Sequence, residues 1–380
     1  MTVVFVTSLG VVAYTLLGYP AIIAVLARLR PRAVRSDADF LLRASLIIAA
    51  HNEADVIETK LANTADLDYP AELLEVIVVA DGCDDDTIER ARSFRGTKVI
   101  CESERQGKLA AITRAAAEAS GDVLVFSDAN NQYSRGALRE LVAPLADGSV
   151  GVVTGRKRIV GGDDDRPLDG AEGLYWRYES RLKEWESAAG SSSAVAGEIL
   201  AFRREALYSV PAGMVAEDFA QAMMAASRGW RIVYAPNAVS VERASATTKD
   251  EATRRARIVT GASQALVWLL PSLVSRQPRL AWQVVSHKGM RPLVPGALVA
   301  LGTSSLRLAR RKRAARAAAV AQIGFYLCAA LGRRDEARGR RRRWTYLPYY
   351  FCRMNGAAIE GLTALARGRF DAAWTRVPRA

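Results

Sequence analysis

Four compact apolar runs, separated by helical patterns, constrain the fold of this chain more than any other feature. Each run is a block of aliphatic and β-branched residues of strand length, and the four lie at residues 45–50, 75–80, 97–101 and 122–127. The stretches between them have helical patterns and lie at residues 53–65, 84–94 and 107–119. Strands that are joined by helices run parallel. The pattern therefore predicts an α/β fold, with a mostly parallel central sheet and helices on both faces.

Polar residues follow each apolar run, in the sequences "HNE", "DGCDDD", "ESERQGK" and "DAN". Ligands of such sheets bind at the carboxyl ends of the strands, so we expect a binding site at this edge. Asp128 and Asn130 follow the fourth run two residues apart, and so lie on one side of an extended chain. Their oxygen atoms suit Mg²⁺ or Mn²⁺. The alternative is that both residues cap the turn after the strand.

The N-terminal segment predicts a membrane anchor. No charged residue occurs in the 26 positions from Thr2 to Ala27, which is enough to cross a bilayer of about 30 Å at about 1.5 Å per residue. Arginines follow at positions 28, 30, 32 and 35; by the positive-inside rule they place the next domain in the cytoplasm and the N-terminus outside. The alternatives are a cleaved signal peptide, which would need basic residues before the apolar segment, and a buried core helix.

Two apolar stretches near the C-terminus, residues 292–306 and 317–332, are each shorter than the usual spanning length of about 20 residues. Arginines crowd the loop between them and the segment after them. If both stretches span the membrane, the two basic segments lie on opposite sides of it, so only one of them is cytoplasmic. Either one stretch is re-entrant or interfacial, or the positive-inside preference is overridden.

Charge and motif patterns exclude several classes of protein. The formal net charge of +13 concentrates at residues 28–35 and 307–343, which flank apolar segments, so anionic membrane lipids are the expected partner and nucleic acid is not. The four cysteines lack paired or metal-ligand spacing, which fits a reducing compartment and argues against a disulfide scaffold or a zinc site. No G-x-G-x-x-G follows a strand, and the "GK" at residues 107–108 lacks the rest of a P-loop.

Eight short motifs follow one another between residues 49 and 288: "AAHNE", "VVADGCDDDT", "RQGKLAAITRA", "FSDANN", "VAGE", "AEDF", "RRARI" and "SHK". Together they resemble the family 2 glycosyltransferases, which are membrane-attached enzymes with the GT-A fold that use nucleotide-diphosphate sugars. The resemblance covers about residues 45 to 290. It implies a transmembrane anchor at residues 1–28, a basic linker at 29–44, a cytoplasmic GT-A catalytic domain at 45–285, and a membrane-associated region at 286–380 with one to three short membrane segments.

The resemblance also implies a set of donor-binding residues. The nucleobase and ribose are expected to bind at the ends of the first two strands, at Ala50, Asn52, Glu53 and Asp81. The diphosphate side is expected to meet three cations, Lys108, Arg254 and Arg257. A basic helix face at the membrane is the alternative for the two arginines. Asp128 and Asn130 match the metal-binding D-x-D motif of the family, in which the second aspartate is replaced here by the amide.

For catalysis, the resemblance implies that Asp218 of the "ED" motif is the general base of an inverting transfer. One carboxylate suffices, because it takes the proton of the acceptor hydroxyl while the metal and nearby cations stabilise the leaving diphosphate. Gly197, Glu198 and Glu217 match the acceptor side. The alternative for Glu217 and Asp218 is a pair of acids at a helix N-terminus.

The second half of the chain contains one departure from the family's motifs and one further match. Ile258 replaces the tryptophan of the family's Q/R-x-x-R-W motif, which puts polymer extension in doubt. His287 and Lys288 of "SHK" are expected to anchor the junction with the membrane, and Trp176 is expected to pack a helix.

These expectations together describe an enzyme of the cell inner membrane. It moves a sugar, most simply from a UDP-sugar, to a lipid-linked or polysaccharide acceptor at the cytoplasmic face, in a single or short transfer. Too few spanning segments are visible for an export channel, so export falls to a partner. The alternative is a catalytically degenerate scaffold of a polysaccharide assembly, suggested by Asn130 and Ile258 and opposed by the presence of Asp81, Asp128 and Asp218.

Overall fold

The computed structural model describes residues 1–160, 167–245, 247–340 and 342–369, and the side chains of these residues apart from 167–172. Within them, eight strands form one sheet in the order β3-β2-β1-β4-β7-β6-β8-β5. The strands are β1 (Ala44–Ala50), β2 (Leu74–Asp81), β3 (Thr97–Glu102), β4 (Val123–Asp128), β5 (Gln132–Tyr133), β6 (Val150–Val160), β7 (Leu200–Arg203) and β8 (Arg231–Arg243). The first four are the strands that the apolar runs predict.

The sheet is mixed. The pairs β1–β2, β1–β4, β2–β3 and β6–β8 are parallel, whereas β4–β7, β6–β7 and β5–β8 are antiparallel. The prediction of a mostly parallel sheet holds for the first half of the chain, where a helix separates each strand from the next. The prediction does not include β6 and β7, because neither strand lies between two segments with a clear helical periodicity.

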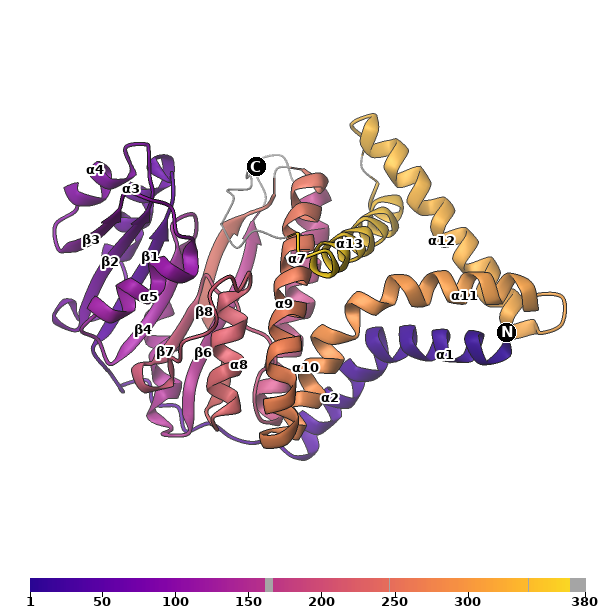
Figure 1. The fold of residues 1–380 in the computed structure, drawn as a ribbon, viewed down its shortest axis with the longest axis horizontal. Coiled ribbons are helices and arrows are strands. Elements are labelled where there is room, and N and C mark those ends of the chain that lie inside the picture. The colour runs from indigo at the N-terminus through magenta and orange to yellow at the C-terminus, as the bar shows by residue number, and fades with distance from the viewer. Residues whose placement is uncertain (161–166, 246, 341, 370–380) are drawn as a thin grey trace.

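Helices cover both faces of the sheet, as predicted (Figure 1). On one face, α5 (Lys108–Glu118), α8 (Glu217–Ser227) and α9 (Thr248–Arg276) share a core with inward side chains such as Ile47 and Phe126. On the other face, α3 (Ala54–Ala65), α4 (Thr87–Ser93) and α6 (Ala137–Val142) contribute to a second core with Ile48 and Val125. Alternate residues of each central strand thus enter different cores, because successive side chains point to opposite faces.

Of the remaining helices, the one at Pro167–Ala189 lies against β6 and β8, where Lys183 Nζ donates to the carbonyl of Gly155 at 3.2 Å, and others extend away from the sheet. The remaining helices are α1 (Thr2–Ala13), α2 (Tyr19–Leu29), α7 (Pro167–Ala189), α10 (Pro278–Val284), α11 (Val294–Leu308), α12 (Arg313–Ala337) and α13 (Arg343–Ala366), with π-helical turns η1 (Tyr14–Gly18) and η5 (Val285–Gly289) and short 3₁₀ turns η2 (Ala71–Leu73), η3 (Ala143–Ala146), η4 (Arg204–Ala206) and η6 (Arg291–Leu293). Helix α1 lies beside α11, with Phe5 packed among Leu301 and Leu308 (Figure 1). The chain pattern did not predict α13, which packs on α9 through Gly361.

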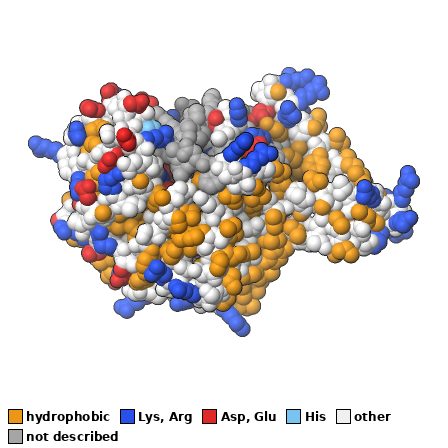
Figure 2. All heavy atoms as spheres, viewed as in Figure 1, with side chains coloured by type: hydrophobic (Ala, Val, Ile, Leu, Met, Phe, Trp, Pro, Cys, Tyr) orange, Lys and Arg blue, Asp and Glu red, His pale blue; other side chains and the backbone are white. Residues whose placement is uncertain are grey.

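Within the described residues, three helices are long and apolar enough to cross a membrane: Thr2–Leu29, Thr248–Arg276 and Arg313–Ala337. The first is the predicted anchor, and the third contains the predicted stretch 317–332. The second is α9, which buries Ala265, Leu269 and Leu273 in the core of the sheet and exposes Val267 and Val274. Figure 2 shows hydrophobic side chains gathered over the middle and right of the view, with Lys and Arg at the far right end.

Candidate active site

The carboxyl ends of the first four strands meet at one edge of the sheet. Ala49 pairs with Asp128 across β1 and β4, and Asp81 pairs with Glu102 across β2 and β3. The imidazole Nδ1 of His51 lies 2.7 Å from the carbonyl oxygen of Asp81, which joins the ends of β1 and β2. The structure therefore brings the predicted strand-end residues together.

Asp81 shapes the loop that leads to Lys108. Its carboxylate is 5% exposed and accepts the backbone N–H of Gln106 and of Gly107, both at 2.8 Å. The loop approaches so closely that a Cβ on Gly82, at φ +62°, would lie 2.7 Å from the backbone nitrogen of Arg105. Only glycine fits such a conformation and contact without strain. The result is that α5 begins with Lys108 at the edge of the sheet.

The residues after β1 hold the loop after β2. Asn52 has φ 55°, and its side-chain oxygen accepts the N–H of Asp84 at 3.0 Å. The backbone N–H of Glu53, which is fully buried, donates to the hydroxyl of Thr87 at 2.8 Å. Ala50, the last residue of β1, lies beside Cys83, whose thiol is 3.7 Å from the Ala50 carbonyl. All the residues predicted to hold the nucleobase and ribose thus lie in one pair of linked loops.

Lys108 lies among the acidic residues of the site. Its ammonium nitrogen is 2.5 Å from Oδ1 of Asp128 and 3.7 Å from Oε1 of Glu217. Burial alone would lower the pKa of Lys108, but Asp128 and Glu217 raise it above its usual value. The lysine is thus a permanent cation at the tip of β4.

Asp218 lies one residue beyond Glu217, in the first turn of α8. Burial, together with the neighbouring Glu217, raises the pKa of its carboxyl to about 7. Its Oδ1 accepts its neighbour's backbone N–H, that of Phe219, at 2.7 Å. The other face of the carboxylate is packed against Gly197, where a Cβ would lie 2.5 Å from Oδ2 of Asp218. The two predicted residues, base and acceptor-loop glycine, are therefore in direct contact.

Asn130 and Asn131 differ in their surroundings. The side-chain oxygen of Asn130 is buried, and within the described part of the chain it has no hydrogen-bond partner. Asn131, which was not predicted, is 1% exposed; its oxygen accepts Lys60 Nζ at 2.6 Å and its amide donates to the carbonyl of Glu198 at 3.0 Å. Burial lowers the pKa of Lys60 to about 7. The second asparagine of "DANN", directly after the predicted ligand Asn130, was the feature of the sequence that could have indicated a role for Asn131.

The predicted acceptor residue Glu198 is paired with a lysine that sequence reasoning missed. Lys157 Nζ lies 3.1 Å from Oε1 of Glu198 and also pairs with Glu242. The same ammonium lies over the ring of Trp176, 5.0 Å from its centroid, and the guanidinium of Arg254 is 5.7 Å from that ring. Trp176 therefore contacts two cations, in addition to any packing on its helix.

The predicted arginines differ in how well the structure defines their surroundings. Arg254 donates to Glu251, with Nε 2.9 Å from Oε2, so its charge is balanced within α9. Arg257 lies on the same helix and is partly buried. Contact of either with a diphosphate stays a prediction.

The metal-binding prediction can be tested against the same geometry. Among the described residues, no group of three or more His, Cys, Asp or Glu side chains is placed to hold a metal ion. Asp128 and the unpartnered oxygen of Asn130 supply two oxygen ligands. Mg²⁺ or Mn²⁺ often takes few protein ligands, because substrate phosphates and water fill the remaining coordination positions. The ammonium of Lys108 against Asp128 shows that this position favours a cation. The residues present therefore fit a divalent metal held jointly with a diphosphate.

Comparison with known proteins identifies the domain. The model of the family "Glycosyl transferase family 2" matches residues 45–210. Residues 45–210 form a glycosyltransferase domain of family 2. For these residues, the predicted family and the GT-A fold are confirmed.

Similar proteins support the same conclusion. This chain is 27% identical over 203 residues to the poly-β-1,6-N-acetyl-D-glucosamine synthase of Staphylococcus aureus, in an alignment that covers 51% of this chain and 48% of that one. It is 29% identical over 240 residues to the probable glycosyltransferase YdaM of Bacillus subtilis, covering 58% and 55%. The chain thus spans about half the length of the curated relatives it matches.

A solved structure matches nearly the whole chain. The mannosyltransferase PcManGT from Pyrobaculum calidifontis, in complex with GDP-Man and Mn²⁺, superimposes with a TM-score of 0.69 at 26% identity, covering 94% of this chain and 99% of that one. The likeness therefore includes the helices outside the glycosyltransferase domain.

Proposed function

We propose that this chain transfers a sugar from a nucleotide-diphosphate donor to an acceptor hydroxyl with inversion, and that Asp218 is the general base. The observation that carries the proposal is the contact of Asp218 with Gly197, beside Lys108 and Asp128. A base with a pKa of about 7 is half ionised at neutral pH, which suits proton transfer under those conditions.

The transfer needs one proton movement and one displacement. The acceptor oxygen forms a bond to the anomeric carbon, its proton passes to the carboxylate of Asp218, and the bond from that carbon to the diphosphate breaks with its electron pair leaving on the diphosphate. Lys108 is positioned to neutralise that charge, since it needs only to exchange Asp128 for a phosphate oxygen. No second carboxylate is required.

A divalent metal, when bound, would add charge stabilisation at the diphosphate. Asp128 and Asn130 would hold it, and the Mn²⁺ bound by PcManGT supports this assignment. Asn130 contributes a neutral ligand where an aspartate would contribute a charged one. We therefore expect weaker metal binding by the free protein than by its complex with a nucleoside diphosphate.

The proposal extends to the donor, the acceptor and the location of the enzyme. The resemblance of the motifs favours a UDP-sugar, and the GDP-Man bound by PcManGT makes a GDP-sugar the alternative donor. We propose a lipid-linked or polysaccharide acceptor at the cytoplasmic face of the inner membrane. Supporting this, α9 is apolar enough to span, and its Gly261 packs against Ala216, two residues before Asp218. Export of the product would fall to a partner protein.

A donor screen tests the proposal. The purified full chain, in detergent with a membrane extract as acceptor source, is incubated with UDP- and GDP-sugars, and nucleotide release is measured with and without Mn²⁺. Wild-type protein is expected to release one nucleotide in preference to the other, and Asp218→Asn to release it at least about a hundredfold more slowly. An Asp218→Asn protein with the wild-type rate would remove the assignment of the base.

The alternative, a degenerate scaffold, predicts a different result. Such a protein would bind nucleotide but release none from any donor, and its Asp218→Asn form would be indistinguishable from the wild type. The complete set of Asp81, Lys108, Asp128 and Asp218 in one connected site favours the enzyme.

A further inference from the structure

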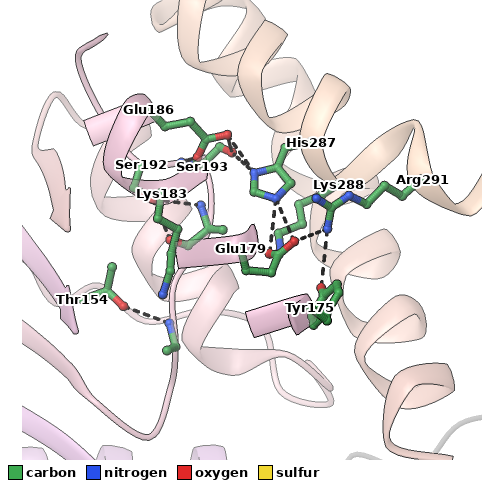
Figure 3. A network of polar contacts seen from close by, with 12 residues as sticks. Thr154, Tyr175, Glu179, Lys183, Glu186, Ser192, Ser193, His287, Lys288 and Arg291 are labelled. Carbon is green, nitrogen blue, oxygen red and sulfur yellow. Dashed lines mark hydrogen bonds and ion pairs between the residues drawn. The ribbon is translucent and has the colours of Figure 1, made fainter. Parts of the chain in front are cut away.

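A buried polar cluster joins α2, α7 and η5, outside the residues assigned to the reaction. Its members on α7 and η5 are shown in Figure 3. Its central members are at most 3% exposed: Tyr19, Glu179, Glu186, Ser193 and His287. We call these five residues the junction cluster. Figure 3 shows the carboxylates of Glu179 and Glu186 pointing from α7 toward the two sides of the His287 ring.

Glu186 is the shared acceptor of this cluster. Its Oε1 lies 2.7 Å from Nδ1 of His287 and also accepts the hydroxyl of Tyr19. Ser193 donates to it twice, from its hydroxyl to Oε1 at 2.8 Å and from its backbone N–H to Oε2 at 2.9 Å. One side chain of α7 therefore joins the N-terminal helix, the segment before α11 and the loop after α7.

Glu179 holds the other side of the ring. Its carboxylate lies 3.3 Å from Nε2 of His287 and 3.2 Å from Lys288 Nζ, and it also pairs with Arg291. Burial alone would raise the pKa of Glu179, but Arg291 and the neighbouring cations hold it well below its usual value. Burial acts likewise on Glu186, whose pKa is nevertheless lowered, chiefly by His287. Each ring nitrogen of His287 therefore faces a carboxylate of α7, and the two carboxylates hold the ring between them.

The loop held by Glu186 is the loop that contacts the general base. Ser193 lies near its start, and three residues later the N–H of Ala196 donates to the hydroxyl of Thr154 at 2.9 Å. Gly197 comes next, against Asp218, and the carbonyl of Glu198 accepts the Asn131 amide at 3.0 Å. Residues 191–198 are thus fixed at one end by the junction cluster and at the other by the active site.

We propose that His287 and Glu186 are positioning residues: they fix the loop 191–198 so that Gly197 holds the carboxylate of Asp218 in place for proton transfer. Tyr19 links helix α2 to Glu186, so the predicted membrane anchor also helps to position the acceptor side of the site. The proposal rests on the role of Asp218 given above. It predicts that loss of the cluster slows sugar transfer without weakening nucleotide binding, because the donor loops around Asp81 lie outside it.

Two variants of the full chain test this role. His287→Gln removes the bridge between the two glutamates, and Ser193→Ala removes only the hydroxyl while the backbone N–H stays bonded to Glu186. Lys288→Gln is the matched control, since Lys288 is the next residue and contacts Glu179 but not the loop. Three properties are measured for each: kcat per nucleotide-binding molecule, the Kd of the nucleoside diphosphate, and amide hydrogen exchange.

His287→Gln is expected to lower kcat between about tenfold and about a hundredfold, as small displacements of a catalytic group do, with the nucleotide Kd unchanged. Ser193→Ala is expected to show a smaller loss of the same kind, and Lys288→Gln none. Amide exchange over residues 191–198 is expected to rise in both loop variants, while exchange over residues 123–131 stays at the wild-type level.

Either of two results would overturn the proposal. One is wild-type kcat and wild-type exchange over residues 191–198 in both loop variants. The other is a parallel loss of nucleotide binding and protection throughout the domain, which would make the cluster a general element of stability. A wild-type chain that transfers no sugar would instead refute the proposed function, and the exchange measurement would still decide whether the cluster fixes the loop.

Discussion

Replacing Gly197 by alanine tests the contact on which the catalytic proposal depends. A Cβ at this position would lie 2.5 Å from Oδ2, and 2.9 Å from both Cβ and Cγ, of Asp218. Rotation of the carboxylate could relieve the first contact but not the contact with Cβ, which is attached to the backbone of α8. The loop and the helix must therefore move apart.

The size of the effect follows from these distances. Carbon atoms pack at about 3.5–4.0 Å, so the two backbones must separate by about 0.6–1.1 Å. Overpacking of this kind costs about 1–3 kcal/mol of stability, or about 2–12 °C in Tm for a domain of this size. A displacement of about 1 Å lowers the rate of a positioned reaction by up to about a hundredfold. We expect Gly197→Ala to fold and to bind nucleotide, with kcat reduced by about ten- to a hundredfold.

The assay is nucleotide release at saturating donor, with the Tm measured in parallel. Gly136→Ala is the matched control, because a Cβ there has no atom within 4 Å; its kcat and Tm should match the wild type. The effect of Gly197→Ala on kcat should also largely disappear in an Asp218→Asn background, because the two residues act through one contact. A Gly197→Ala protein with wild-type kcat, or full additivity of the two changes, would refute the reasoning.

The charges of the site predict how activity and stability depend on pH and how two substitutions change metal binding. Because the base must be ionised, kcat is expected to rise with pH through about 7, the raised pKa of Asp218, in a profile measured from pH 5.5 to 9; a rate independent of pH over that range would contradict it. A folded-state pKa raised above the usual value near 4 contributes stability that is present at low pH and is lost as pH rises through about 7, so Asp218→Asn should raise Tm more at pH 8 than at pH 5. Lys108→Met should raise the affinity of the nucleotide-free protein for Mn²⁺, measured by electron paramagnetic resonance, because it removes the cation that occupies Asp128. Asn130→Asp should do the same by adding a charged ligand, and unchanged Mn²⁺ affinity in both variants would place the metal elsewhere.

The first half of the fold was readable from the sequence because each element there is bounded by its own local pattern. The apolar runs at residues 45–50 and 122–127 became β1 and β4 within one residue of their predicted ends. The antiparallel strand β7, four residues long between a loop and a 3₁₀ turn, had no such boundaries. Its place beside β4 depends on pairing across more than 70 residues of chain, which no local pattern records.

The candidate site divides in the same way. Asp128, Lys108 and Asp218 were identifiable because each stands within a motif whose order along the chain matches a family. Lys157 and Lys60 were not, because neither belongs to a motif and each contacts its partner, Glu198 or Asn131, across a long stretch of chain. Asn131 ends the motif "FSDANN", but its contact with the carbonyl of Glu198 exists only in the folded chain. The buried lysines are also of a residue type that sequence reasoning normally assigns to the surface.

The sequence by itself determined the α/β class, the edge of the sheet at which polar residues gather, and the family of the enzyme, because strand period, turn residues and motif order are local properties of the chain. Only the tertiary structure decided that Lys108 neutralises Asp128, that Gly197 contacts Asp218, and that Glu186 joins two distant segments of the chain to one loop. These contacts join residues up to 167 positions apart, as Tyr19 and Glu186 show. Their energies come from burial and charge pairing that exist only once the chain has folded.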